Sequence, residues 1–271
     1  MIPSGSDNPI GIFDSGVGGL TILRAVRETL PHENLVYVAD DAYVPYGQKP
    51  PEQIRSRCLA IADFLQAQGA RAIVVACNTA TAAAIDAMRE RWSIPFVGVE
   101  PAVKPAVAAT RSGVVGVLAT PATLQSPRYL SLLERFAGAT RIVGQACAGL
   151  AEHIERGHAD DALTERLLRS FVDPLLAQRA DVIVLGCTHY PLVAHIIRRI
   201  AGPDVAVIEN GTAVAKELAR QLAARGPGRQ GGAGGESFWS SGSHERMRSL
   251  LRELWSPHAQ LQPLPESPAR G

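Results

Sequence analysis

Short apolar runs alternate with longer segments of helical periodicity along the chain, and this alternation limits the possible folds more than any other feature. The runs are rich in Val and Ile and apolar on both faces, as buried parallel strands are. We expect strands at 9–13, 35–39, 72–76, 94–98, 114–118, 141–145, 182–186 and 205–208. We expect helices at 19–30, 52–68, 79–91, 124–136, 160–179, 191–200 and 212–225. Strands that alternate with helices predict an α/β protein with parallel sheets.

The two halves of the chain contain similar strand-to-turn segments in the same order. Residues 11–15 (GIFDS) are matched at an offset of 105 by residues 116–120 (GVLAT). Residues 72–80 (AIVVACNTA) are matched at an offset of 110 by residues 182–190 (VIVLGCTHY). The alternative explanation is chance similarity between apolar strands. A duplicated unit explains both matches, so we predict two similar parallel-sheet α/β domains with the active site in the cleft between them.

The length of 271 residues is typical of about two domains. We expect the first domain to comprise residues 1–98 together with 211–256, and the second to comprise residues 99–210. The final segment, residues 257–271, contains four prolines and few apolar residues, which predicts a disordered tail.

The C-terminal part of the first domain has its own pattern. The glycine-rich segment 226–236 predicts a flexible loop. We expect a strand at 238–241 and a helix at 243–255 after it.

Composition excludes several classes of protein. The formal net charge is only +1, without the basic patch that a nucleic-acid-binding protein needs. No apolar run approaches the length of a membrane span, and the N-terminus lacks the pattern of a secretory signal. The four cysteines (Cys58, Cys77, Cys147 and Cys187) are too widely spaced for a structural zinc site. We therefore expect a cytoplasmic protein with free thiols, no metal, no nucleic-acid partner and no membrane partner.

Nucleotide-binding motifs are absent or incomplete. Residues 16–21 (GVGGLT) resemble a dinucleotide-binding loop, but Thr21 occupies the place of the third glycine. The chain also lacks a phosphate-binding loop with its Lys and a Gly-x-Ser-x-Gly elbow.

The candidate chemistry lies where predicted strands end, which is where parallel sheets bind ligands. Asp14 and Ser15 follow the first strand, Cys77 follows the third, and Cys187 and His189 follow the strand at 182–186. Both cysteines precede helical patterns, and the N–H groups at a helix N-terminus stabilise a thiolate.

A single cysteine in such a place is more often a buried apolar side chain than a catalyst. We keep this interpretation for Cys58 and Cys147. Cys77 and Cys187 differ because they occupy equivalent strand ends of two similar units. Two thiols on opposite faces of one carbon, one ionised and one protonated, can invert its configuration. Asp14 and His189 could assist them, although Asp14 could equally cap a helix and His189 could be structural.

Five motifs resemble those of the glutamate racemases of the aspartate/glutamate racemase family. They occur in order over most of the chain: IGIFDSGVGGL (10–20), VPYGQK (44–49), VACNTAT (75–81), GVEPAVKPA (98–106) and LGCTHYPL (185–192). The resemblance implies a cofactor-independent amino-acid racemase that supplies D-glutamate for peptidoglycan, with glutamate as its small-molecule substrate. It also implies two similar α/β units around the active site, and a homodimer.

The resemblance assigns roles residue by residue. Cys77 would act on D-glutamate, with Asp14 beside it, and Cys187 on L-glutamate, assisted by His189. Glu155 would be a further acidic catalytic residue, but the sequence around it departs from the family pattern, and an exposed helix carboxylate is the alternative. The substrate-binding residues would be Asp14, Ser15, Tyr46, Gly47, Asn78, Thr79, Thr188 and His189.

Other functions account for fewer of these residues. A cysteine hydrolase would use Cys187 and His189 but leave Cys77 unexplained. A non-catalytic amino-acid-binding protein would need no pair of thiols. A racemase that uses pyridoxal phosphate needs a Schiff-base lysine, and none of Lys49, Lys104 and Lys216 lies in a recognisable cofactor motif.

Overall fold

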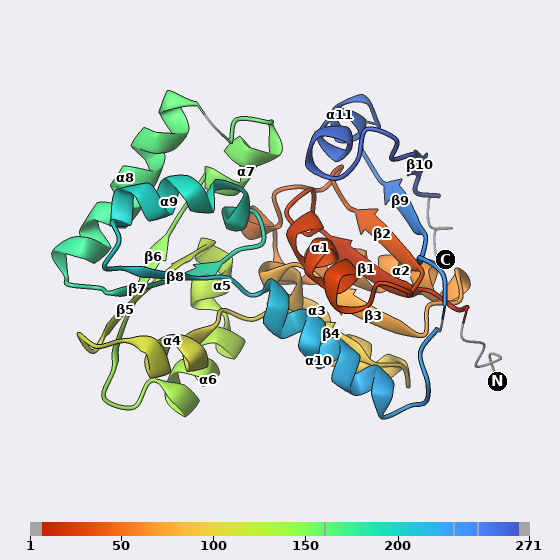
Figure 1. Cartoon of the computed structure of the whole chain (residues 1–271), viewed down its shortest axis with the longest axis horizontal. Coiled ribbons are helices and arrows are strands. Elements are labelled where there is room, and N and C mark those ends of the chain that lie inside the picture. Colours follow the sequence, from red (N-terminus) through yellow and green to blue (C-terminus); the bar gives the residue numbers. More distant parts are fainter. Residues whose placement is uncertain (1–6, 160, 230, 243, 266–271) are drawn as a thin grey trace. The chain divides into compact units, whose positions relative to one another are not determined.

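In the computed structural model, the chain forms two compact α/β units (Figure 1). The structure describes residues 7–159, 161–229, 231–242 and 244–265. The first unit contains the described residues up to Val99 and from Gly211 onward, and the second contains Glu100–Asn210. Among the described residues, no helix combines the length and the apolar character needed to cross a membrane.

The first unit is built on a six-stranded parallel sheet with the order β10-β9-β2-β1-β3-β4. The strands are β1 (Ile10–Asp14), β2 (Leu35–Ala39), β3 (Ala72–Val75), β4 (Phe96–Gly98), β9 (Glu236–Ser240) and β10 (Leu261–Pro263). All residues of β1, β2 and β3 are buried, as expected for strands that are covered on both faces.

Helices cover both faces of this sheet. They are α1 (Leu20–Thr29), the short 3₁₀ helix η1 (Tyr46–Gln48), α2 (Pro51–Ala67), α3 (Asn78–Arg91), α10 (Gly211–Ala223) and α11 (His244–Leu254). Phe13, Val38 and Val75 join the core that α2 and α3 form on one face. On the other face α10, which comes after the whole second unit in the sequence, packs against α1 (Figure 1).

The second unit has a four-stranded parallel sheet with the order β6-β5-β7-β8. Its strands are β5 (Val114–Ala119), β6 (Arg141–Ala146), β7 (Val182–Gly186) and β8 (Ala206–Ile208). Its helices are α4 (Val103–Ala109), α5 (Pro121–Gln125), α6 (Pro127–Phe136), α7 (Leu150–Glu155), α8 (Ala162–Ala177), the 3₁₀ helix η2 (Tyr190–Val193) and α9 (Ala194–Ala201). Leu118 and Leu185 pack with residues of α7, α8 and α9, while Val117 and Val184 pack with residues of α4 and α6 on the opposite face.

The two sheets share one strand order. In the first unit β2-β1-β3-β4 corresponds to β6-β5-β7-β8 in the second, and β9 and β10 extend only the first sheet. The correspondence includes a close helix-to-strand contact in each unit, because a glycine leaves room for a leucine. A Cβ atom on Gly11 of β1 would lie 2.9 Å from Leu65 of α2, and one on Gly116 of β5 would lie 2.6 Å from Leu175 of α8.

The expectation of a disordered tail over residues 257–271 differs from the structure. Leu261–Pro263 form β10, which pairs in parallel with β9, and Leu261 is buried. The backbone hydrogen bonds of an edge strand can be satisfied in a segment that has few apolar residues. Residues 266–271 lie outside the described residues.

Two α-helices of the described residues were not expected from the sequence, and one expected helix is divided. The structure adds the short helices α4 and α7. The helix expected at 124–136 is two helices, because Ser126 precedes Pro127 in an extended conformation and caps the second of them. A residue before proline disfavours the helical region of the backbone.

Leu175 and Leu163 provide a test of the contact over Gly116. Leu175 is fully buried and Leu163 is 45% exposed, and both lie on α8. Leu175→Ala should lower the free energy of unfolding of the second unit by about 2–5 kcal/mol, because a cavity remains against the sheet. Leu163→Ala should change it by no more than about 0.5 kcal/mol. Urea unfolding followed by circular dichroism measures both, and equal losses would contradict the packing described.

Candidate active site

The first group of candidate side chains lies at the carboxyl ends of β1 and β3. These strands are neighbours, with Phe13 opposite Val75, so the residues that follow them lie side by side. The Cys77 thiol donates to Ser15 Oγ over 3.9 Å, and the Ser15 hydroxyl donates to Asp14 Oδ1 over 3.4 Å. The structure thus brings Cys77, Ser15 and Asp14 into one chain from thiol to carboxylate, with all three side chains buried.

Asp14 is held by the glycine-rich turn that follows it. Its Oδ2 accepts a hydrogen bond of 2.7 Å from the backbone N–H of Gly19, the residue that precedes α1. A Cβ atom on Gly19 would lie 2.5 Å from Cβ of Asp14 and 2.8 Å from Oη of Tyr37. The turn therefore requires glycine at position 19 to reach the carboxylate.

Cys77 occupies the N-cap position of α3, which begins at Asn78, and its side chain makes no capping hydrogen bond to the helix. Asn78 and Thr79 are buried in that turn. The Asn78 amide donates to the carbonyl of Val99 over 3.3 Å, and its Oδ1 has no hydrogen-bond partner within the described residues. A buried amide oxygen without a donor is costly, so Asn78 presents an acceptor suited to a ligand.

Tyr46 and Gly47 lie in η1, which packs near α3. Tyr46 is buried, and its hydroxyl donates to Asp40 Oδ2 over 2.6 Å. Burial raises the pKa of Tyr46 well above its usual range, and the Asp40 carboxylate that accepts its hydrogen bond raises it further. Tyr46 is therefore a neutral hydrogen-bond donor, and Gly47 beside it is half-buried.

The second group lies at the carboxyl end of β7 and contains Cys187, Thr188 and His189, all buried. Cys187 Sγ lies 3.8 Å from Nδ1 of His189, and Nε2 of His189 lies 2.7 Å from Oε2 of Glu155. Glu155 is the last residue of α7 and only 2% exposed. The alternative that it is an exposed helix carboxylate is therefore wrong.

The His189 imidazole lies between the Cys187 thiol and the Glu155 carboxylate, and its surroundings favour the protonated form. Burial alone would lower its pKa, but hydrogen bonds and charges from Cys187 and Glu155 outweigh burial and raise the pKa well above its usual range. The protonated imidazole can then donate to both neighbours at once. In this arrangement the imidazole can donate a proton to Cys187 Sγ.

Among the residues that the structure describes, the two remaining cysteines have no carboxylate relay or imidazole beside the thiol. Cys58 is fully buried in α2, and Cys147 is buried after β6. Burial raises the pKa of each thiol far above its usual range, so both remain neutral thiols.

Asp40 and Arg57 hold Tyr46 in place, although neither was expected from the sequence to belong to the site. Asp40 is fully buried and accepts hydrogen bonds of 3.0 and 2.7 Å from Nε and Nη2 of Arg57, as well as the one from Tyr46. Asp40 follows the strand expected at 35–39, so the strand-end rule that selected Asp14 could have selected it too. No comparable signal marks Arg57, which lies within α2.

In the described ranges of the chain, no group of three or more His, Cys, Asp or Glu side chains is placed to hold a metal ion.

Comparison with known proteins identifies the class. The model of the Asp/Glu/Hydantoin racemase family matches residues 20–218. The glutamate racemase of Methylococcus capsulatus is 49% identical over 269 residues, which cover 99% of each chain.

Solved structures agree. Glutamate racemase RacE1 from Bacillus anthracis has a TM-score of 0.90 at 31% identity, covering 97% of this chain and 99% of that one. Escherichia coli glutamate racemase, in complex with L-glutamate and the activator UDP-MurNAc-Ala, has a TM-score of 0.84 at 30% identity, covering 95% and 98%. The protein is therefore a racemase, an enzyme of the isomerase class. The chain belongs to the Asp/Glu/Hydantoin racemase family, which confirms the resemblance seen in its motifs.

The contact between His189 and Glu155 can be tested by a single substitution. Glu155→Gln should lower the pKa of His189, because the neutral amide no longer stabilises the imidazolium. Since the pKa is raised by folding, this ion pair stabilises the protein below the unfolded pKa of about 6.5, and its contribution is lost as pH rises through the folded pKa. Histidine ¹⁵N NMR titration, assigned with His189→Asn, measures the shift.

Glu152→Gln on the same helix provides the control. It should leave the His189 titration in place. An unchanged His189 titration in Glu155→Gln would contradict the ion pair.

Proposed function

We propose that the protein interconverts L- and D-glutamate without a cofactor, and that the D-glutamate supplies peptidoglycan synthesis. The observation that carries this proposal is the placement of Cys77 and Cys187 at equivalent strand ends, after β3 and β7 of two sheets with one strand order. Glutamate as substrate is supported by the glutamate racemases that resemble the chain over nearly its full length. One of these binds L-glutamate in its solved structure.

In this mechanism the two thiols act on opposite faces of the α-carbon. The Cys187 thiolate removes the α-proton of L-glutamate, and its electron pair remains on carbon as a carbanion delocalised into the carboxylate. The Cys77 thiol then donates a proton to the other face, which gives D-glutamate. Each turnover leaves Cys187 protonated and Cys77 ionised, so the reverse reaction starts from Cys77.

The groups beside each thiol explain how its protonation state is controlled. On the L-glutamate side, His189 stabilises the Cys187 thiolate and Glu155 holds the imidazole at 2.7 Å. On the D-glutamate side, Ser15 links Cys77 to the buried Asp14 carboxylate. Asp14 can accept a proton through Ser15 as the Cys77 thiol ionises. His189, in contrast, acts on Cys187 through the positive charge of its imidazolium. The two thiols are therefore served by different acid–base groups.

Substrate binding falls to small polar side chains near the two thiols. The Asn78 amide oxygen is a suitable acceptor for the α-ammonium group, since no protein donor reaches it within the described residues. Ser15, Thr79 and Thr188 offer hydroxyl groups close to the cysteines in sequence, all of them buried. Tyr46 and Gly47 contribute a neutral hydroxyl and a backbone N–H from η1.

The proposal includes a cytoplasmic homodimer. A cytoplasmic location agrees with four free cysteines among the described residues. A cysteine hydrolase remains the second candidate because Cys187 contacts His189. It would require no second thiol at the end of β3.

Proton exchange in D₂O tests the reaction itself. Purified protein incubated in D₂O with L- or D-glutamate, without pyridoxal phosphate, should produce the opposite enantiomer with deuterium at the α-carbon. The reason is that the proton delivered by the second thiol comes from solvent. Chiral chromatography with mass spectrometry measures both quantities. L-Aspartate is the matched substrate control and should remain unlabelled, and absence of exchange from both glutamate enantiomers would refute the proposal.

Serine substitutions test the two-thiol assignment. Cys77→Ser and Cys187→Ser should each lower kcat for racemisation by about 10²–10⁴-fold, because a hydroxyl is a far weaker acid–base group at neutral pH. Cys58→Ser and Cys147→Ser are the matched controls and should retain most activity per folded protein. A hydrolase would tolerate Cys77→Ser, so unchanged turnover in that variant would disprove the mechanism.

A further inference from the structure

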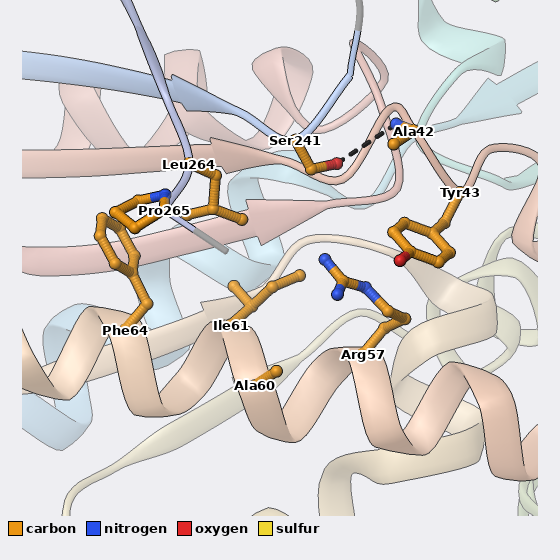
Figure 2. A pocket seen from close by; sticks show the side chains of 9 residues that line it. All are labelled: Ala42, Tyr43, Arg57, Ala60, Ile61, Phe64, Ser241, Leu264 and Pro265. Atoms are coloured by element: carbon orange, nitrogen blue, oxygen red, sulfur yellow. Dashed lines mark hydrogen bonds between the residues drawn. The ribbon is translucent and has the colours of Figure 1, made fainter. Parts of the chain in front are cut away.

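The first unit contains a pocket of about 420 Å³ that includes none of the candidate active-site residues. It lies between α2, the segment after β2 and the last described residues after β10 (Figure 2). Its volume is within the range of about 300–1,000 Å³ typical of small-molecule sites.

The pocket has an apolar end and a polar end. Ile61, Phe64 and Leu264 line the apolar end. Arg57, Tyr43 and Ser241 line the polar end, and Figure 2 shows the guanidinium of Arg57 extending between Ile61 and Tyr43. Polar atoms make up more of the exposed lining than apolar atoms, so the pocket suits a ligand that has both a polar group and an apolar body.

The polar end is rich in hydrogen-bond donors. Arg57 uses Nε and Nη2 for Asp40, which leaves other guanidinium N–H groups available. Ser241 Oγ accepts from the backbone N–H of Ala42 over 3.2 Å, so its own hydroxyl hydrogen remains to be donated. The Tyr43 ring lies 4.0 Å from the guanidinium of Arg57. Within the described residues, the hydroxyls of Tyr43 and Ser241 donate to no acceptor that the structure shows.

The only carboxylate bound to Arg57 within the described residues does not line the pocket. Asp40 is fully buried beneath Arg57 and has its oxygens directed to Arg57 and Tyr46. The pocket is therefore lined by the guanidinium of Arg57, which donates hydrogen bonds, and not by the Asp40 carboxylate, which accepts them. An anion suits this lining, and a planar carboxylate suits a guanidinium best.

We propose that this pocket binds a small organic carboxylate with an apolar body, separately from the racemase site. The carboxylate contacts Arg57, Tyr43 and Ser241, and the apolar body packs between Phe64 and Leu264.

Occupancy of the pocket also affects Tyr46. A ligand carboxylate shares the guanidinium with Asp40, and Asp40 is the acceptor for the Tyr46 hydroxyl at 2.6 Å. A change in the Arg57–Asp40 contact therefore reaches η1. This second step rests on the proposed function, in which Tyr46 lines the glutamate site.

Binding is tested by isothermal titration calorimetry with 4-phenylbutyrate, in the presence of saturating glutamate. Its neutral amide, 4-phenylbutanamide, should bind at least about 10-fold more weakly, because it cannot form charge-assisted hydrogen bonds with Arg57. Ala60→Leu places a larger side chain in the pocket while Arg57 is kept, and it should lower the affinity for 4-phenylbutyrate at least about 10-fold. Ala67→Leu, the same change at an exposed position of α2, should leave affinity unchanged.

Two results would overturn the binding site: no saturable binding up to about 10 mM, or equal affinity in the wild type and Ala60→Leu. Coupling is measured separately as the KM for glutamate with and without 4-phenylbutyrate. It should change in the wild type and in Ala67→Leu but not in Ala60→Leu. An unchanged KM with binding intact would overturn the coupling alone. Absence of racemisation in every variant, with calorimetric binding intact, would refute the proposed function and not the site.

Discussion

Burial of the central strands on both faces is the constraint from which the rest of the structure follows. β1, β3, β5 and β7 are covered by helices on each side, so polar side chains within them would be buried without partners. Polar groups such as Asp14 are tolerated at the last strand residue or beyond it, where turns and helix N-termini supply hydrogen bonds. The thiols and their partners therefore collect at these ends, and their positions are set by strand order before any chemistry is considered.

The same framework carries different chemistry in its two copies. By register, Asp14 after Phe13 in β1 corresponds to Ala119 in β5, so the second unit has no carboxylate at the equivalent position. Its thiol partner comes instead from the turn after β7 and from α7, as His189 and Glu155. One strand order thus supports a hydroxyl relay beside Cys77 in the first unit and an imidazole beside Cys187 in the second.

Much of this could be predicted from the sequence, because strands that are apolar on both faces are distinct in composition and the cysteines directly follow them. The expected strand at 182–186 coincides with β7, so the position of Cys187 directly after the strand could be predicted. Contacts between distant segments could not be predicted in this way. The burial of Glu155 depends on how α7 packs, and the link from Arg57 through Asp40 to Tyr46 joins three elements without a common motif. Strand β10 was missed because edge pairing requires little apolar character.

The second unit is an insertion within the first, and this has a consequence for biosynthesis. Residues 100–210 are contiguous, whereas the first unit receives α10, β9 and β10 only after them. On the ribosome, the second unit can complete its fold while α1 still lacks α10 and the edge of β2 still lacks β9. The first unit to be translated is therefore the last to be finished, and the apolar surface that α10 and β9 cover stays incomplete on the nascent chain until those segments have been made.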